Sequence, residues 1–168
     1  MNKSQLSFRN ATTTIVTLLI SLSGMVAFSQ PGMPQRSLVV TPSQSISFGK
    51  FCLAGNGGTI TVNAQGVTTS TGGIVIISSS NTHPAIFEIK LCPGRNISFN
   101  LGGTTHLSNG GATYLDLVLD SSDKGLSFST NNDCNFITSL RVGGTLTIPG
   151  GAQTGIYSGN FELTFNQQ

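Results

Sequence analysis

Near the end of the chain, residues 140–148 read LRVGGTLTI and residues 155–165 read GIYSGNFELTF. In the second stretch Phe161, Leu163 and Phe165 alternate with polar residues, which is the period-two pattern of a strand with one buried face. The glycines before them let a backbone bend or pass close to a neighbour. We therefore expect a final strand that closes the fold, with these three apolar side chains inside the protein's own core.

The same alternation recurs along the chain in short runs separated by Gly, Asn, Ser and Pro clusters, at residues 85–91, 97–101 and 115–119. Residues 74–77 are apolar on both faces, which predicts a central strand covered on both sides. Asn56-Gly57-Gly58 predicts a turn, because Asn and Gly tolerate positive φ. About eight or nine short strands of this kind predict an all-β protein with an antiparallel β-sandwich.

The chain of 168 residues is long enough for one domain with a real core, and only 8% of it is charged. The formal net charge is +2, but Lys3 and Arg9 lie in a segment that we expect to be removed. Without them the 8 basic residues become 6, equal to the 6 acidic ones. A neutral domain without clustered cations excludes a nucleic-acid partner and attachment to anionic lipid through a basic patch.

The first residues have the composition of a secretory signal peptide, with a basic start, an apolar run over residues 15–27 and small residues at Ala27 and Ser29. The apolar run is shorter than the roughly 20 residues that span a membrane, and polar residues interrupt it. We expect residues 1–29 to be the signal peptide, residues 30–37 a short leader and residues 38–168 the β-sandwich domain. The mature protein would then be secreted or at the cell surface, or in the periplasm, with no transmembrane segment.

Several motifs resemble a bacterial family of secreted domains. They are GGTITV at residues 57–62 and TGGI at 71–74 in the first half, and VGGTLTI at 142–148 and GIYSGNF at 155–161 in the second. The family is DUF4402, a domain of unknown function, and the resemblance covers residues 38–165. It implies export, and it supplies no catalytic residues.

A more distant resemblance is carried by residues 87–94, FEIKLCPG. They are similar to a strand that ends in a cysteine in pilin and spore-coat-U-like subunits. This resemblance implies an immunoglobulin-like sandwich exported across the inner membrane.

Three cysteines, Cys52, Cys92 and Cys134, lie in the mature part, where export would expose them to oxidising conditions. They allow three single pairings, each of which leaves one cysteine over. If every strand reverses the previous one, Cys52 and Cys134 fall at the same end of the sandwich. The pilin resemblance implies instead a bridge from the first strand region to Cys92. Both alternatives use Cys52, so we expect Cys52 to be in a disulfide.

No residue pattern predicts catalysis, a metal or a cofactor. His83 and His106 lack a nearby partner at the spacing of a structural zinc site, and no serine lies in a nucleophile-elbow motif. The acidic residues do not have the spacing of a calcium loop, and they fit the solvent face of a strand or a turn; they are Asp116, Asp120, Asp123 and Asp133. Tyr114 and Tyr157 could stack on sugars, but packing in the core or at an edge is the simpler expectation.

These observations lead to the hypothesis of an exported, non-enzymatic β-sandwich, a structural or assembly component at the cell surface. Its partner would be a surface or periplasmic protein, and the domain itself would be a monomer. The alternative is an extracellular module that binds a glycan or protein ligand through loops at one end of the sandwich.

Signal cleavage gives the first testable prediction. The mature protein should begin at Gln30, and an intact-mass measurement of exported material should lack the mass of residues 1–29. A mass that retains those residues would mean that the apolar run is an uncleaved anchor.

Overall fold

The computed structural model describes residues 37–91, 95–131, 133 and 135–167. All the secondary-structure elements in these residues are β-strands. The strands are β1 (Val39–Gln44), β2 (Ser47–Val62), β3 (Thr68–His83), β4 (Ala85–Lys90), β5 (Asn96–Asn100), β6 (Thr105–Ser108), β7 (Tyr114–Ser122), β8 (Ser127–Ser129), β9 (Thr138–Pro149) and β10 (Thr164–Gln167). The described residues contain no helix long and apolar enough to cross a membrane. The predicted signal peptide lies outside them.

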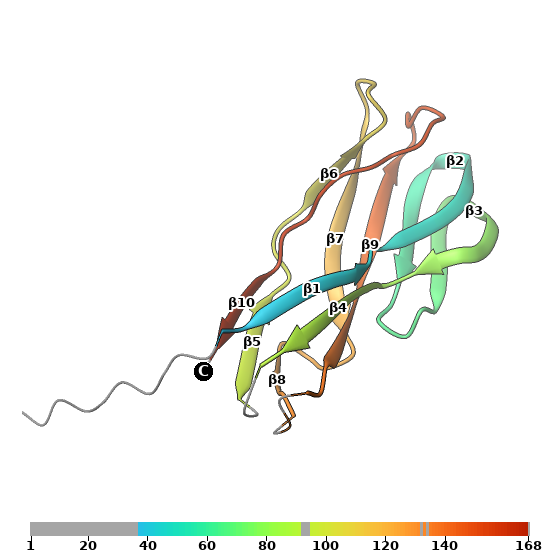
Figure 1. The fold of residues 1–168 in the computed structure, drawn as a ribbon. Coiled ribbons are helices and arrows are strands. Elements are labelled where there is room, and N and C mark those ends of the chain that lie inside the picture. The colour runs from blue at the N-terminus through green and yellow to red at the C-terminus, as the bar shows by residue number, and fades with distance from the viewer. Residues whose placement is uncertain (1–36, 92–94, 132, 134, 168) are drawn as a thin grey trace, which may run out of the picture. The chain divides into compact units, whose positions relative to one another are not determined.

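All paired strands are antiparallel, and they form two sheets (Figure 1). The larger sheet has the order β1-β4-β9-β2-β3, and β7 joins it by pairing with β9 and with β6. The smaller sheet has the order β10-β5-β8. The prediction of an all-β sandwich is therefore confirmed.

Strand β9, which contains the motif VGGTLTI, is the centre of the larger sheet. Residues 138–142 pair with β4, residues 144–149 pair with β2, and β7 pairs along the opposite edge. Gly144 lies where these neighbours converge, and a methyl group there would be 2.8 Å from the carbonyl oxygen of Val118. The buried side chains of this strand include Leu140, Val142, Leu146 and Ile148. The double glycine thus lets β7 approach β9 closely while the flanking residues fill the core.

Strands β2 and β3 form a hairpin of two 16-residue strands, and the predicted turn at residues 56–58 is wrong. Those residues lie inside β2, where the pairing shifts between Leu53 and Gly58. Gly57 has a φ of 107°, so its conformational freedom produces an irregularity within the strand and not its end. The hairpin turn follows β2, where the side chain of Asn63 accepts hydrogen bonds from the N–H groups of Gln65 and Val67.

The prediction of a doubly covered strand at residues 74–77 is also wrong. β3 lies at the end of the larger sheet. Ile74 is buried, whereas Val75 and Ile77 are 52% and 66% exposed. One face of this segment packs on the core and the other faces solvent, so its continuous apolar run does not reflect burial on both sides.

Aromatic side chains join the two sheets. The ring of Phe87 in β4 lies 6.3 Å from those of both Phe161 and Phe165, measured between centroids. Phe99 in β5 stacks on Phe165 at 5.6 Å and meets Phe128 in β8 edge-on at 6.2 Å. Contacts of this geometry add to the burial of apolar area between the sheets.

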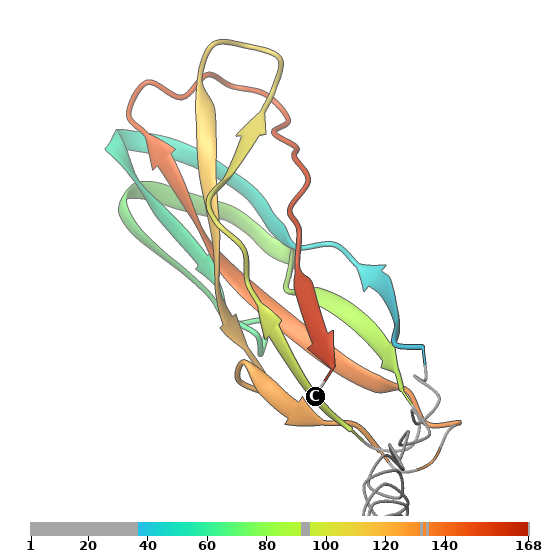
Figure 2. The same cartoon turned by 90° about the vertical axis from the view of Figure 1, so that its left-hand side faces the viewer.

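The C-terminal strand is shorter and less buried than its alternating pattern predicts. β10 begins at Thr164, and Phe161 and Leu163 precede it outside any strand. Phe161, Leu163 and Phe165 do pack against the core, as expected, but each remains partly exposed. Figure 2 shows the segment running past β6 before it reaches β10 beside β5. Among the described residues β10 pairs only with β5, so the C-terminal strand forms an edge of the smaller sheet.

This difference in burial predicts different costs of truncation. Leu140→Ala, at a fully buried site, should lower the free energy of unfolding by about 2–5 kcal/mol. Leu163→Ala should cost clearly less, because its side chain is already partly in contact with water. Urea denaturation of both variants and the wild type measures the two values, and equal losses would contradict the partial exposure of Leu163.

Candidate functional site

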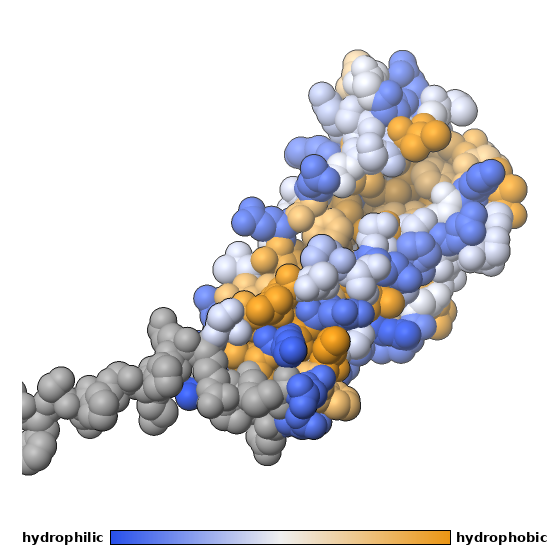
Figure 3. Space-filling model, in the orientation of Figure 1, coloured by the Kyte–Doolittle hydropathy of each residue, from blue (hydrophilic) through white to orange (hydrophobic). Residues whose placement is uncertain are grey.

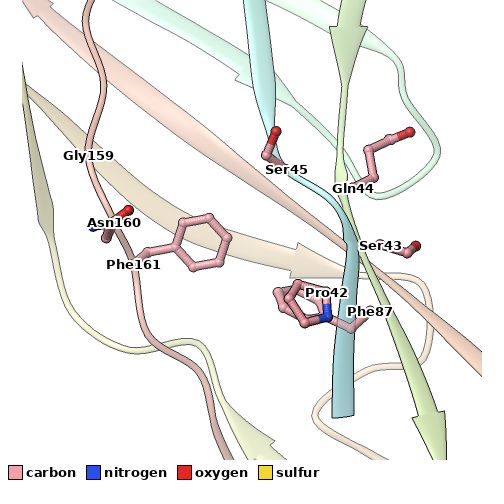
Figure 4. Close-up of a pocket in the computed structure, with 8 residues that line it drawn as sticks. All are labelled: Pro42, Ser43, Gln44, Ser45, Phe87, Gly159, Asn160 and Phe161. Carbon is pink, nitrogen blue, oxygen red and sulfur yellow. The ribbon is translucent and has the colours of Figure 1, made fainter.

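A groove lies between β1 and the segment that leads into β10 (Figure 4). It encloses a volume of about 350 Å³. The lining residues are Pro42, Ser43, Gln44, Ser45, Phe87, Gly159, Asn160 and Phe161. They come from β1 and the residue after it, from β4 and from the segment that precedes β10, so only the folded domain brings them together.

Each wall of the groove lacks a neighbouring strand on at least one side among the described residues. Within the described part of the chain, β1 pairs only with β4, and β10 pairs only with β5. Residues 159–163, between them, belong to no strand. Unpaired N–H and C=O groups along such edges can hydrogen-bond to another extended chain. The groove therefore offers the backbone arrangement that strand addition uses.

The floor of the groove is aromatic. Figure 4 shows the ring of Phe161 projecting from the C-terminal segment toward β1, and this ring packs edge-on against Phe87. In Figure 3, hydrophobic colour reaches the surface around β1 and continues into a hollow beside it. An apolar side chain of an added strand would find contact area here.

The rim of the groove is polar and uncharged. It offers the hydroxyl groups of Ser43 and Ser45 and the amide of Asn160, while the side-chain amide of Gln44 donates to the carbonyl oxygen of Pro84 at 2.8 Å. None of the described residues that line the groove has an ionisable side chain. This chemistry suits binding of an extended neutral segment.

The described residues show no disulfide through Cys52. Cys52 carries a free, exposed thiol on β2, opposite Val75 of β3. Cys92 and Cys134 lie outside the described residues. A bridge that includes either of them stays a prediction from the sequence.

The histidines and acidic residues form no metal site in the described residues. His83 is partly buried at the end of β3, and His106 in β6 lies 2.6 Å from Asp116 in β7, measured between Nδ1 and Oδ1. Asp123 accepts a hydrogen bond from the backbone N–H of Arg141 at 2.8 Å.

The remaining acidic residues also have structural partners. Asp120 accepts a hydrogen bond from the hydroxyl of Thr145, and Asp133 accepts one from the backbone N–H of Asn135. Asp116 and Asp120 lie on the solvent face of a strand, as the sequence predicts. Asp123 lies at a turn, also as predicted.

The two tyrosines differ in their burial and in their contacts. Tyr157 packs against the core and donates its hydroxyl to the carbonyl oxygen of Gln153 at 2.9 Å. Tyr114 is 53% exposed on the outward face of β7, and its ring contacts that of His106. Of the expected packing in the core or at an edge, the core alternative holds for Tyr157, whereas Tyr114 lies outside the core.

Sequence reasoning did not find the groove. The one sequence feature that points to the groove is Pro42 in β1. Proline has no backbone N–H group, so within a sheet it is found on edge strands. That signal marks β1 as an edge, but it does not identify the segment across the groove.

Comparison with known proteins assigns a family and no activity. The model of the family described as "Domain of unknown function (DUF4402)" matches residues 38–166. No curated protein and no solved structure matches the chain. The more distant likeness to pilin and spore-coat-U subunits stays a prediction.

The exposed thiol gives a direct test of the cysteine chemistry. Alkylation of the native protein without reductant, followed by peptide mass analysis, should label Cys52, because its side chain is accessible. Cys52→Ser should then leave the free energy of unfolding nearly unchanged. An unlabelled Cys52 in a disulfide-linked peptide, with a loss of about 2–4 kcal/mol in the variant, would instead support the bridge predicted from the sequence.

Proposed function

We propose, from the premise that this chain belongs to the DUF4402 family, that it is an exported, non-enzymatic structural or assembly component at the cell surface. The observation that carries the proposal is the groove between β1, an edge strand that pairs only with β4 among the described residues, and residues 159–163, which belong to no strand. In this function the groove accepts an extended segment of a surface or periplasmic partner protein. Main-chain hydrogen bonds would provide affinity, and the aromatic floor would select an apolar side chain.

The partner segment is not the chain's own leader. Residues 30–36 read QPGMPQR and contain two prolines, which cannot donate to a strand ladder. Met33 is the only large apolar residue among them, whereas a strand seated on this floor needs alternating apolar side chains. A segment from another protein fits the groove better.

The uncharged lining favours assembly over catalysis. General acid–base chemistry needs a titratable side chain within hydrogen-bond reach of the reacting group. The groove offers hydroxyl, amide and aromatic groups instead. These groups can hold a backbone and one apolar side chain in place, which is what a structural contact requires.

Site-specific photo-crosslinking in the producing cell tests this function. A photoreactive phenylalanine analogue in place of Asn160, which is exposed at the groove, should form a discrete covalent adduct with one partner protein. The same analogue at Ser139, which is exposed on β9 and outside the groove, provides the matched control and should form no such adduct. Protease treatment of whole cells should degrade the protein in the wild type, as expected for a surface location.

Two results together would overturn the proposal. They are recovery of the protein only as a protease-protected, soluble periplasmic monomer, and the absence of any adduct specific to the groove. An adduct at both positions would show contact without a preference for the groove, and would also count against it.

A further inference from the structure

One row of polar side chains crosses five neighbouring strands of the larger sheet. Thr71 of β3 lies opposite Thr59 of β2, which lies opposite Thr147 of β9. Thr147 in turn lies opposite Asp116 of β7, which lies opposite His106 of β6. We refer to these five residues as the polar row. With strands about 4.8 Å apart, its four intervals span roughly 19 Å.

The polar row lies on the outward face of the sheet. The neighbours of its residues along each strand point the other way and are buried, as Ile60, Leu117 and Leu146 show. Thr71 and Thr147 are exposed, and the side chains of His106 and Asp116 are 65% and 48% exposed.

Hydrogen bonds between strands hold these groups in place. The hydroxyl oxygens of Thr59 and Thr71 lie 2.7 Å apart, and His106 contacts Asp116 at 2.6 Å. Thr147 lies between these two pairs in the row, and its side chain belongs to an exposed residue. The row therefore presents hydroxyl, carboxylate and imidazole groups whose positions are set before any ligand arrives.

An exposed aromatic ring flanks the row. Tyr114 precedes Asp116 by two residues in β7, so its side chain projects from the same face, and it is 53% exposed. Its ring centroid lies 6.2 Å from that of His106. Aromatic rings of this kind provide a rigid apolar surface with a polar hydroxyl at the tip.

We propose that the polar row and Tyr114 bind a neutral polysaccharide chain that lies across the strands. Sugar hydroxyls both donate and accept hydrogen bonds, and they match threonine hydroxyls, the Asp116 carboxylate and the His106 ring. The C–H face of a pyranose packs on an aromatic ring such as that of Tyr114. A chain ligand can also follow the twist of the sheet, which a flat crystalline surface could not do.

The charges on this face select against acidic polymers. The row and its neighbour Asp120 contribute carboxylates, and no Lys or Arg belongs to the row. An acidic polysaccharide would meet the like charge of Asp116, and no Lys or Arg of the row would offset that charge. The site uses a sheet face and shares no residue with the groove, so it is independent of the proposed assembly function. It also differs from the loop-based binding expected from the sequence.

Binding assays with defined oligosaccharides test the proposal. The probes are the hexasaccharides of cellulose, laminarin, xylan and chitin, with an alginate hexasaccharide as the acidic probe, measured by calorimetry against the purified mature protein. At least one neutral hexasaccharide should bind saturably and more tightly than the corresponding disaccharide, because a longer chain covers more of the row. The acidic probe should not bind.

Two pairs of variants locate the binding. Tyr114→Ala should weaken the affinity about tenfold, while Phe136→Ala, which removes an aromatic ring of similar exposure (55%) outside the row, should leave it unchanged. Thr147→Val removes one hydroxyl from the row at nearly constant shape and should also weaken binding. Thr41→Val makes the same change at an exposed position of β1 and should not.

Thermal unfolding of all four variants shows whether each is folded before its affinity is compared. Saturable binding to none of the neutral probes would overturn the proposal. So would binding that the two row variants leave intact, or a preference for alginate. Loss of the groove-specific crosslink would bear on the assembly function alone.

Discussion

The structure depends on how closely three strands approach β9. This strand gives hydrogen bonds to β4 and β2 along one edge and to β7 along the other, while its alternate side chains fill the core. A side chain at Gly144 would collide with the carbonyl oxygen of Val118 and push β7 away. Because β6 is attached to the sheet through its pairing with β7, that displacement would disturb the pairing of both strands. The motif VGGTLTI therefore encodes a close backbone approach as well as a buried face.

The periodicity of the sequence predicted the class of fold and most of the core, because alternation directly reports which side chains point inward. Phe87, Ile89 and Leu91 are buried as their spacing indicates. Features that depend on pairing across the sheet were not predictable. Residues 56–58 are a reasonable turn by local chemistry, yet β2 continues through them because Gly58 pairs with both Gly72 and Ile148. Local preference is overridden there by two ladders of hydrogen bonds.

The candidate sites could not be predicted from the sequence for the same reason. The groove joins residues 42–45 to residues 159–161, and the polar row joins five strands through their register. Register depends on the whole sheet, and a shift by one residue would turn the threonines of the row toward the core. The spacing Thr-x-Thr at residues 59–61, 69–71 and 145–147 is visible in the sequence, but its alignment becomes evident only in the folded sheet.

The outward threonines connect strands without using charge. Thr59 is hydrogen-bonded to Thr71, and Thr61 is hydrogen-bonded to Thr145 at 2.8 Å. Ions screen contacts between surface charges, with a Debye length of about 10 Å at 0.1 M ionic strength, but they hardly affect hydrogen bonds between neutral hydroxyls. Hydroxyls of threonine also do not titrate in water. These links between strands should therefore persist from fresh water to brine, a tolerance that ion pairs in the same positions would not confer.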